Sequence, residues 1–365
     1  MPPQGLSARN MLSYDMIEHG KPLQRAVRDT PKPQGTEVLV RITRCGVCHS
    51  DLHIWDGYFD LGGGKRFYVK DRGCVPPFTL GHEPFGVVEA LGPDAKGVAI
   101  GAKRVVYPWI GCGECAVCRA GQDNYCLAQR FLGVSRPGGY ASHLIVAHPR
   151  YLVDAEGIDE SFAATLACSG VTTYSAIKKL LPLAPREWVV VLGCGGLGLI
   201  ALSTLRALGI ERVIACDIDE AKLASAREAG ALETVNSRAG EEALARIQSI
   251  SAGAVAGALD FVGMPTTANL GIAALAKGGR YILCGLFGGE ITLSLPPIAQ
   301  RAIGIVGSYV GNLQELNEVV ALVRSGKLKP APIETRPIAE VNRVLDELKV
   351  GKILGRVVLN VNGAL

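Results

Sequence analysis

The sequence lacks several features that mark particular classes of protein. No window approaches the about 18 apolar residues that cross a bilayer, and residues 1–20 lack the apolar stretch of a signal peptide. The net charge of only +4 is scattered, and no basic cluster is interleaved with aromatic residues. Internal repeats, low-complexity segments and long linkers are also missing. These absences argue against a membrane, secreted or nucleic-acid-binding protein and predict a cytoplasmic one.

The 365 residues, 48% of them hydrophobic, contain enough apolar material for two cores. Before about residue 170, short β-rich segments alternate with glycine and proline turns; after it, strands alternate with helices. We therefore predict an α/β protein with three parts. They are an irregular β-rich catalytic domain (1–169), a doubly wound Rossmann domain with a parallel sheet (170–309), and a C-terminal segment (310–365) of two helices and a final strand.

Four of the eleven cysteines crowd into one stretch of the chain. Two-residue gaps let a tight, glycine-containing loop direct three sulfurs at one centre, while a longer excursion returns the fourth. Four thiolates close a tetrahedral Zn²⁺ site, so the zinc predicted here is structural. Disulfides or unrelated surface cysteines are the alternatives, but dense cysteine in a chain without a signal peptide usually indicates metal. The predicted ligands are Cys112, Cys115, Cys118 and Cys126.

A second possible metal site combines thiolates with an imidazole. A catalytic zinc needs a mixed ligand set with one position left for water or substrate. Cys48, His82 and Cys168 offer such a set. Each is a weak signal alone, since a cysteine in an apolar run such as that around Cys168 is more often a packing residue. Their presence together with the four-cysteine stretch favours a catalytic zinc.

A glycine-rich turn connects an apolar, β-rich run to a helical segment. Gly193 allows the tight turn, Gly195 lets the backbone approach a pyrophosphate, and Gly198 allows helix and strand to pack closely. A second apolar strand ends in Asp217, whose carboxylate can accept hydrogen bonds from both ribose hydroxyls and would repel a 2′-phosphate. The pattern predicts NAD as cofactor, unless Asp217 merely caps a surface turn. Further predicted cofactor-binding residues are Thr172, Gly196, Leu197 and Lys222.

Over nearly its whole length, the chain resembles a zinc-dependent alcohol dehydrogenase of the medium-chain dehydrogenase/reductase family. The segments that carry the resemblance are GVCHSDLH (46–53), GHEPFGVV (81–88), the four-cysteine stretch, CSGVTTY (168–174), GCGGLG (193–198) with Asp217, and GKILGRVVL (351–359). The resemblance implies a GroES-like catalytic domain to which the C-terminal segment returns. It also implies reversible hydride transfer between an alcohol and NAD.

The resemblance further implies roles for single residues. The catalytic zinc would be held by Cys48, His82 and Cys168 with Glu83 beside it, and the four clustered cysteines would hold the structural zinc. A proton would leave the alcohol through the Ser50 hydroxyl and the cofactor ribose to His53, and a histidine pKa near 6.5 suits that last step.

Two more residues match family positions that touch the cofactor phosphates, namely His49 and Arg356. Plainer interpretations remain for these and for the relay histidine. His49 and His53 can be ordinary surface residues, and Arg356 can be a surface charge.

The substrate pocket is the least determined part. Trp55 and Trp109 lie beside the ligand segments and are predicted to wall the substrate site, unless they are core residues. The link between Trp55 and Gly81 is longer than usual and reads as a loop, which either borders the substrate entrance or is a neutral surface excursion. The compact chain between Cys126 and Cys168 resembles the tetrameric microbial enzymes and predicts a homotetramer.

The leading functional hypothesis is an NAD-dependent zinc dehydrogenase that acts on a small-molecule alcohol and yields an aldehyde or ketone. A polyol dehydrogenase or one for a more specialised hydroxy compound would share both zinc sites. A non-catalytic nucleotide- and zinc-binding protein is a third hypothesis. Loss of a catalytic ligand or of Glu83 would have favoured it, and none of these residues is lost.

Overall fold

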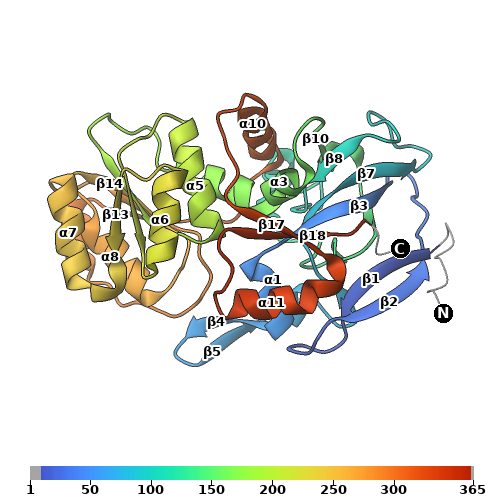
Figure 1. Ribbon diagram of the computed structural model, residues 1–365, viewed down its shortest axis with the longest axis horizontal. Helices are drawn as coiled ribbons and strands as arrows, with labels where there is room; N and C mark the ends of the chain where they lie inside the picture. Colours follow the sequence, from blue (N-terminus) through green and yellow to red (C-terminus); the bar gives the residue numbers. More distant parts are fainter. Residues whose placement is uncertain (1–9, 363–365) are drawn as a thin grey trace.

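The computed structural model describes residues 10–362 of the chain. Residues 1–9 and 363–365 lie outside the described part. The prediction that residues 1–20 form no signal peptide therefore falls partly outside it. An α/β half and a β-rich half lie side by side, at the left and right of Figure 1. Both halves predicted from the sequence are therefore present. No helix among the described residues has the length and apolar character needed to span a bilayer.

The larger sheet of the β-rich half is built around the long strand β3 (Val38–Val47), eight of whose ten residues are buried. Its neighbours in space are all antiparallel to it: β7 (Glu83–Leu91), β9 (His143–Val146) and β18 (Arg356–Asn360). The sheet is completed by β8 (Lys103–Val106), β10 (Leu152–Asp154) and β17 (Ile333–Pro337). A second, three-stranded sheet has the order β2 (Gln24–Asp29), β1 (Asn10–Met16), β6 (Phe78–Thr79).

The end of the chain is part of this first sheet. β17 pairs parallel with β18, and β18 pairs antiparallel with β3. Two helices accompany these strands, α10 (Leu313–Arg324) and α11 (Val341–Lys349). α11 lies close to α1 (His49–Asp56), below β18 in Figure 1. Segments from opposite ends of the sequence are thus packed together around β3.

The α/β half contains a six-stranded, wholly parallel sheet. Its strands lie in the order β13 (Glu233–Asn236), β12 (Val213–Asp217), β11 (Trp188–Leu192), β14 (Val255–Asp260), β15 (Arg280–Leu283), β16 (Gly304–Gly307). The chain therefore reverses its direction of travel across the sheet between β11 and β14. In a doubly wound sheet this switch point opens a crevice outside the carboxyl ends of the strands, where nucleotides bind.

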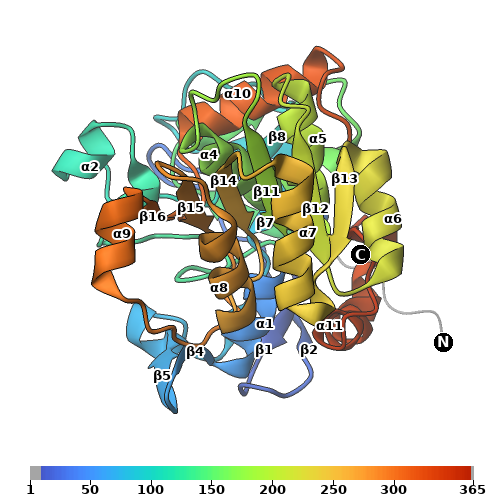
Figure 2. The same ribbon diagram turned by 90° about the vertical axis from the view of Figure 1, so that its left-hand side faces the viewer.

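Helices cover both faces of the parallel sheet, and β11 shows why its sequence is continuously apolar. Val189 and Val191 belong to the core under α4 (Val171–Lys178), α5 (Gly196–Ala207) and α6 (Glu220–Ala229). Val190 and Leu192 belong to the opposite core under α7 (Glu241–Ser251) and α8 (Pro265–Ala274), which lie in front of the strands in Figure 2. The short α9 (Leu295–Arg301) precedes β16.

The link between Trp55 and Gly81 is more regular than the loop predicted for it. β4 (Tyr58–Gly62) and β5 (Lys65–Tyr68) form an antiparallel hairpin. Gly63 and Gly64 connect the strands with φ of +56° and +75°, and a two-residue connection with both φ values positive favours glycine.

The tip of this hairpin meets the loop that follows β15. A Cβ added to Gly288 would lie 2.5 Å from the Asp60 carbonyl oxygen, and one added to Gly62 would lie 2.8 Å from the Glu290 nitrogen. Both glycines have positive φ. The close backbone approach therefore requires glycine on each side of the contact between the two halves.

Candidate zinc sites and cofactor cleft

The four clustered cysteines converge on one point. Their sulfurs lie within 4.8 Å of one another, with separations of 3.4 Å (Cys115 to Cys118), 3.8 Å (Cys115 to Cys126) and 3.9 Å (Cys112 to Cys118). Four sulfurs at 2.3 Å from a tetrahedral zinc would be about 3.8 Å apart, whereas disulfide sulfurs are about 2.05 Å apart. All four are free thiols, which excludes the disulfide alternative. The chemistry and spacing of this donor set fit a closed, structural zinc.

The backbone of the loop that carries these cysteines packs closely against their sulfur atoms. Cys115 precedes the single-turn helix α2 (Ala116–Arg119) as its N-cap. The backbone N–H groups of Cys112 and Cys115 point at sulfurs of the same cluster, at 3.3 and 3.4 Å. A Cβ on Gly111 would lie 2.4 Å from the Cys118 sulfur, so the chain needs glycine where it enters the cluster.

The second cluster brings together Cys48, His82, Glu83 and Cys168, all of them buried, with ligand atoms within 4.8 Å of one another. The Nε2 atom of His82 is buried and has no hydrogen-bond partner among the described residues. Buried ring nitrogens are normally satisfied, and a metal ion shared with the two sulfurs would satisfy this one. The donor set fits a zinc with an open position.

Three different elements deliver these ligands. Cys48 is the N-cap of α1, where the positive end of the helix dipole favours a thiolate. His82 directly precedes β7. Cys168 lies in the wide helical turn Leu166–Gly170, which interrupts the run from α3 (Glu160–Thr165) into α4. A hydrogen bond from Cys168 is the main influence that lowers the pKa of Cys48 well below its ordinary value.

Glu83, the fourth member of the second cluster, is held by an arginine. Its carboxylate accepts two hydrogen bonds of 2.5 Å from the Arg356 guanidinium, and both side chains are almost fully buried. Burial raises the pKa of Glu83 to about 7, against the opposing charge of Arg356. Arg356 also lies on the glycine-rich turn, since a Cβ on Gly196 would come within 2.5 Å of its Cδ. One arginine therefore joins the candidate zinc site to the candidate phosphate site.

The glycine-rich turn has the geometry that its sequence predicts. Gly193 has φ of +88°, and a Cβ on Gly198 would lie only 1.9 Å from the Gly193 carbonyl oxygen. Gly195 caps α5 without a side-chain hydrogen bond, so the first N–H groups of this helix have no side-chain cap within residues 10–362. Such N–H groups and the helix dipole suit a pyrophosphate.

Asp217 lies at the carboxyl end of β12, next to this turn. Its Oδ2 atom accepts the Cys194 N–H at 2.7 Å, and its Oδ1 atom accepts the Ile218 N–H at 2.7 Å and the Asp219 N–H at 3.1 Å. The hydrogen bonds fix the carboxylate at the switch-point end of the sheet. Lys222 follows in the first turn of α6, whose N-cap is Asp219.

Three predicted residues share one helix, α1. His49 and His53 are one turn apart with ring centroids separated by 5.7 Å, and His49 also packs at 4.4 Å against Phe287 of the α/β half. Ser50 is half-buried between them. Phe59 of the hairpin packs at 4.8 Å against His53. Helix α1 thus presents these side chains toward the boundary between the two halves.

The pKa of His53 differs from the value near 6.5 that suits the predicted relay. Burial, reinforced by the neighbouring His49, lowers it to about 4. The ring is therefore neutral over the physiological range, and it is only partly exposed. The pKa of His49 is also lowered, again mainly by burial.

The two tryptophans lie in different surroundings. Trp109 packs with its ring centroid 5.5 Å from that of His82 and donates its indole N–H to the Ala167 carbonyl at 2.9 Å. Trp55 donates instead to the Lys21 carbonyl at 2.5 Å, and the Lys349 ammonium lies 4.9 Å above its ring. These contacts place Trp109 beside the second cluster, and the predicted place of Trp55 in the substrate site stays a prediction.

Sequence reasoning missed the two aromatic residues that enclose Trp109. Phe131 lies 5.4 Å and Tyr309 lies 6.3 Å from it, measured between ring centroids. Tyr309 follows β16 in the α/β half and carries no motif, so only the fold brings it there. Asp51, which contacts His82, was also missed, although its place three residues after Cys48 is a local signal.

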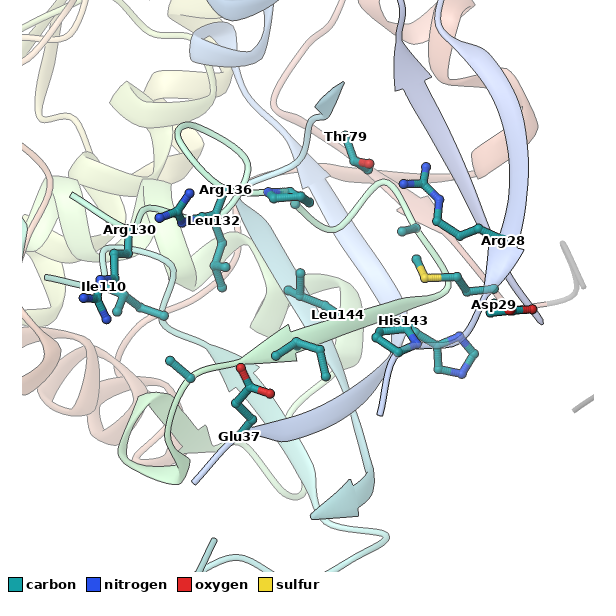
Figure 3. A pocket seen from close by; sticks show the side chains of 17 residues that line it. Arg28, Asp29, Glu37, Thr79, Ile110, Arg130, Leu132, Arg136, His143 and Leu144 are labelled. Atoms are coloured by element: carbon teal, nitrogen blue, oxygen red, sulfur yellow. The ribbon is translucent and has the colours of Figure 1, made fainter. Parts of the chain in front are cut away.

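A separate cavity of about 490 Å³ lies among β1, β2, β9 and the 130–138 segment. Figure 3 shows Arg28, Arg130, Arg136 and His143 around it. None of the residues predicted for zinc, cofactor or proton transfer lines this cavity. This cavity is therefore separate from both clusters and from the glycine-rich turn.

Comparison with known proteins agrees with this geometry. Residues 34–156 match the family described as alcohol dehydrogenase GroES-like domain, and residues 196–325 match zinc-binding dehydrogenase. The chain is 36% identical over 351 residues to the NAD-dependent alcohol dehydrogenase of Sulfurisphaera tokodaii, covering 96% of this chain and 99% of the relative. The chain belongs to the zinc-containing medium-chain alcohol dehydrogenase family.

Two solved structures place this alcohol dehydrogenase family member among its relatives. The alcohol dehydrogenase of Aeropyrum pernix matches with a TM-score of 0.87 at 33% identity, covering 96% of this chain and 99% of that one. The D-arabinose dehydrogenase of Sulfolobus solfataricus matches with a TM-score of 0.80 at 28% identity and the same coverage. The predicted family and fold, a GroES-like β domain with a Rossmann sheet, are confirmed, and both predicted zinc sites are present as candidate sites.

Proposed function

We propose that the protein is an NAD-dependent zinc alcohol dehydrogenase that transfers hydride reversibly between an alcohol and NAD. The observation that carries the proposal is the buried cluster of Cys48, His82 and Cys168 with its unpartnered His82 Nε2 atom. The glycine-rich turn with Asp217 supports NAD, as does the relative from S. tokodaii. Assays of primary, secondary, aromatic and polyol substrates by NADH absorbance test it. No reduction of NAD with any of them would contradict it.

The residues around the cluster have distinct roles in this proposal. A bound zinc stabilises negative charge on the alcohol oxygen, and a bound NAD accepts the hydride. Cys48, His82 and Cys168 hold the metal. Next to them, the Glu83 carboxylate is held in place by its hydrogen bonds to Arg356. The four-cysteine cluster, which has no open position, holds the structural zinc.

The cofactor lies along the carboxyl ends of the parallel strands in this proposal. The N–H groups at the start of α5 bind the pyrophosphate together with His49 and Arg356, and Asp217 binds the ribose hydroxyls. Thr172 supports this placement, since its Oγ1 atom is buried without a hydrogen-bond partner among the described residues. The residues proposed to contact the cofactor are His49, Thr172, Gly193, Gly195, Gly196, Leu197, Gly198, Asp217, Lys222 and Arg356.

The walls near His82 favour an apolar substrate. Trp109, Phe131 and Tyr309 pack together beside it. Because the indole N–H of Trp109 is already donated to Ala167, these rings offer at most the Tyr309 hydroxyl to the several hydroxyls of a polyol. We propose an apolar or aromatic alcohol as the substrate. The likeness to D-arabinose dehydrogenase keeps a sugar or polyol as the second candidate, and the substrate panel distinguishes them. Trp55, whose indole N–H donates to the Lys21 carbonyl, is proposed as a further residue of this pocket.

Three further properties complete the proposal. The catalytic domain spans 1–169, the cofactor domain spans 170–309, and the segment 310–365 returns to the first domain, which the pairing of β18 with β3 supports. We propose a homotetramer in the cytoplasm. Sedimentation of the purified protein tests the oligomeric state.

Replacing Cys115 by serine should lower thermal stability more than it changes the chemistry of the enzyme that survives. Metal binding at the closed cluster is coupled to folding, so we expect the midpoint of unfolding to fall by at least about 5 °C, or about 4 kcal/mol for a chain of this length, and the zinc content to fall by one ion per chain. Scanning calorimetry and metal analysis measure both. Cys74→Ser removes a buried thiol outside both clusters and should keep both zinc ions. A Cys115→Ser protein that also keeps both would contradict the structural site.

Replacing His53 by glutamine should slow alcohol oxidation about tenfold, less than the 100-fold or more of a direct general base. Because burial lowers the pKa of His53 to about 4, its neutral form is available until the pH falls toward that value. The loss should therefore extend across pH 5 to 8 rather than begin below neutrality.

Small amine buffers should partly restore the rate of alcohol oxidation by His53→Gln. His148→Gln, at an exposed histidine, serves as the control.

Ser50→Ala should lower the rate of alcohol oxidation more than His53→Gln does, because the hydroxyl would take the alcohol proton directly. If His53→Gln oxidised alcohol as fast as wild type at every pH and did not respond to buffer, His53 would have no role in proton transfer.

A further inference from the structure

Four hydrogen-bond donors converge on the carboxylate of Asp51, which is fully buried. Its Oδ1 atom lies 3.0 Å from His82 Nδ1 and accepts the Gly81 N–H at 3.3 Å. Its Oδ2 atom accepts the Cys48 N–H at 2.9 Å and the Tyr140 hydroxyl at 3.0 Å. Asp51 therefore ties the segments of two zinc ligands together, and Tyr140 supplies the one side-chain hydroxyl in the network.

Tyr140 is held rigidly where it makes this contact. Its N–H donates to the Leu80 carbonyl at 2.9 Å, and its own carbonyl accepts the Tyr14 N–H at 2.8 Å. Its ring packs closely against Gly81, the residue before His82, since a Cβ there would lie 2.5 Å from the ring atom Cδ1. The tyrosine is fully buried, so the orientation of its hydroxyl is set by surrounding backbone.

We propose that Tyr140 is a positioning residue of the catalytic zinc site and acts through Asp51. Its hydroxyl fixes the carboxylate, the carboxylate fixes the tautomer and ring plane of His82, and the Nε2 atom is thereby aimed at the two cysteine sulfurs. Hydrogen-bond partners of metal-ligating histidines typically change metal affinity by about 10- to 100-fold. The inference rests on the proposed function, since it concerns the zinc that the cluster would hold.

Tyr140→Phe removes the hydroxyl and keeps the ring. In the full-length protein it should weaken zinc binding at the second cluster about tenfold, the lower end of the range for such partners, as measured by competition with a chromophoric chelator. Cobalt placed in the same site should show shifted visible absorption bands, because the direction of the imidazole ligand changes. The zinc of the four-cysteine cluster should be unaffected.

Tyr281→Phe is the matched control. Tyr281 is equally buried and donates at 2.6 Å to the carboxylate of a buried aspartate, Asp260, in the parallel sheet. Both variants lose one buried hydroxyl bond, so both should lose a similar amount of thermal stability. Only Tyr140→Phe should change zinc affinity and the cobalt spectrum. Equal zinc affinity in the two variants would overturn the inference.

A second variant keeps the test decisive if Tyr140→Phe folds poorly. Asp51→Asn should weaken zinc binding by more than Tyr140→Phe, and adding Tyr140→Phe to it should cause little further loss, since the tyrosine acts through the carboxylate. Additive losses would overturn the proposed route. A wild-type chain that binds zinc only at the four-cysteine cluster would instead overturn the proposed function itself, and this inference with it.

Discussion

His82→Ala should reduce kcat/KM for alcohol oxidation by more than about 100-fold, beyond the loss typical of a residue that merely supports a metal ligand. The imidazole is fully buried, and its Nε2 atom is the one unpartnered ring nitrogen in the second cluster. Removing it leaves two sulfurs and a carboxylate that Arg356 already binds, which cannot complete the mixed ligand set of a catalytic zinc. Steady-state rates and metal analysis should show lost activity together with one zinc ion remaining per chain.

His143→Ala is a suitable control for this prediction. His143 is also buried, but it contacts Ser142 and Glu89 away from both clusters. The control should keep both zinc ions and most of its activity. The thermal midpoint should fall less in His82→Ala than in Cys115→Ser, since the open site contributes to chemistry and the closed one to folding. An active His82→Ala enzyme would refute the assignment of the catalytic site.

Asp217→Ser should raise the KM for NAD and narrow the preference for NAD over NADP by about 10- to 100-fold, or about 1.4 to 2.8 kcal/mol. The carboxylate favours a free 2′-hydroxyl and repels a phosphate there. Its hydrogen bonds to three backbone N–H groups hold it at the end of β12. Initial rates with each cofactor measure the change.

Asp219→Asn separates this effect from a general loss of negative charge. Asp219 is two residues away and caps α6, and asparagine is an equally good N-cap, so the variant should fold normally and keep its preference for NAD. If wild-type enzyme used NADP as readily as NAD, the role of Asp217 would have to be abandoned.

The parts of the site that could be predicted from the sequence are formed by residues close together in the chain. The four ligands of the closed cluster fall within residues 112–126, so their spacing alone predicts their convergence. The turn at Gly193 and the strand that ends in Asp217 were equally predictable, because each is a strand followed by its own signal. By contrast, the donors to Asp51 include Tyr140, 89 residues away, and only the pairing of distant strands brings such residues together.

The hairpin was missed for a different reason. The run Gly62-Gly63-Gly64 looks like flexible loop composition, yet two glycines between β-rich runs are also the signature of a tight hairpin turn. The sequence contained the signal, and the competing interpretation of a long loop obscured it. The pKa of His53 was unpredictable, since it depends on burial beside His49 and Phe59.

The return of the last strand to the first sheet sets an order of events during synthesis. Arg356 pairs with Glu83 across 273 residues, and β18 pairs with β3 in the interior of the first sheet. At about 5 to 20 residues per second, a ribosome needs about 14 to 55 s to add that stretch. The four cysteines of the closed cluster have all been translated by residue 126, whereas the bond from Arg356 to Glu83 cannot form until translation is nearly finished. A chain released early would therefore contain the complete closed cluster but lack Arg356 beside Glu83.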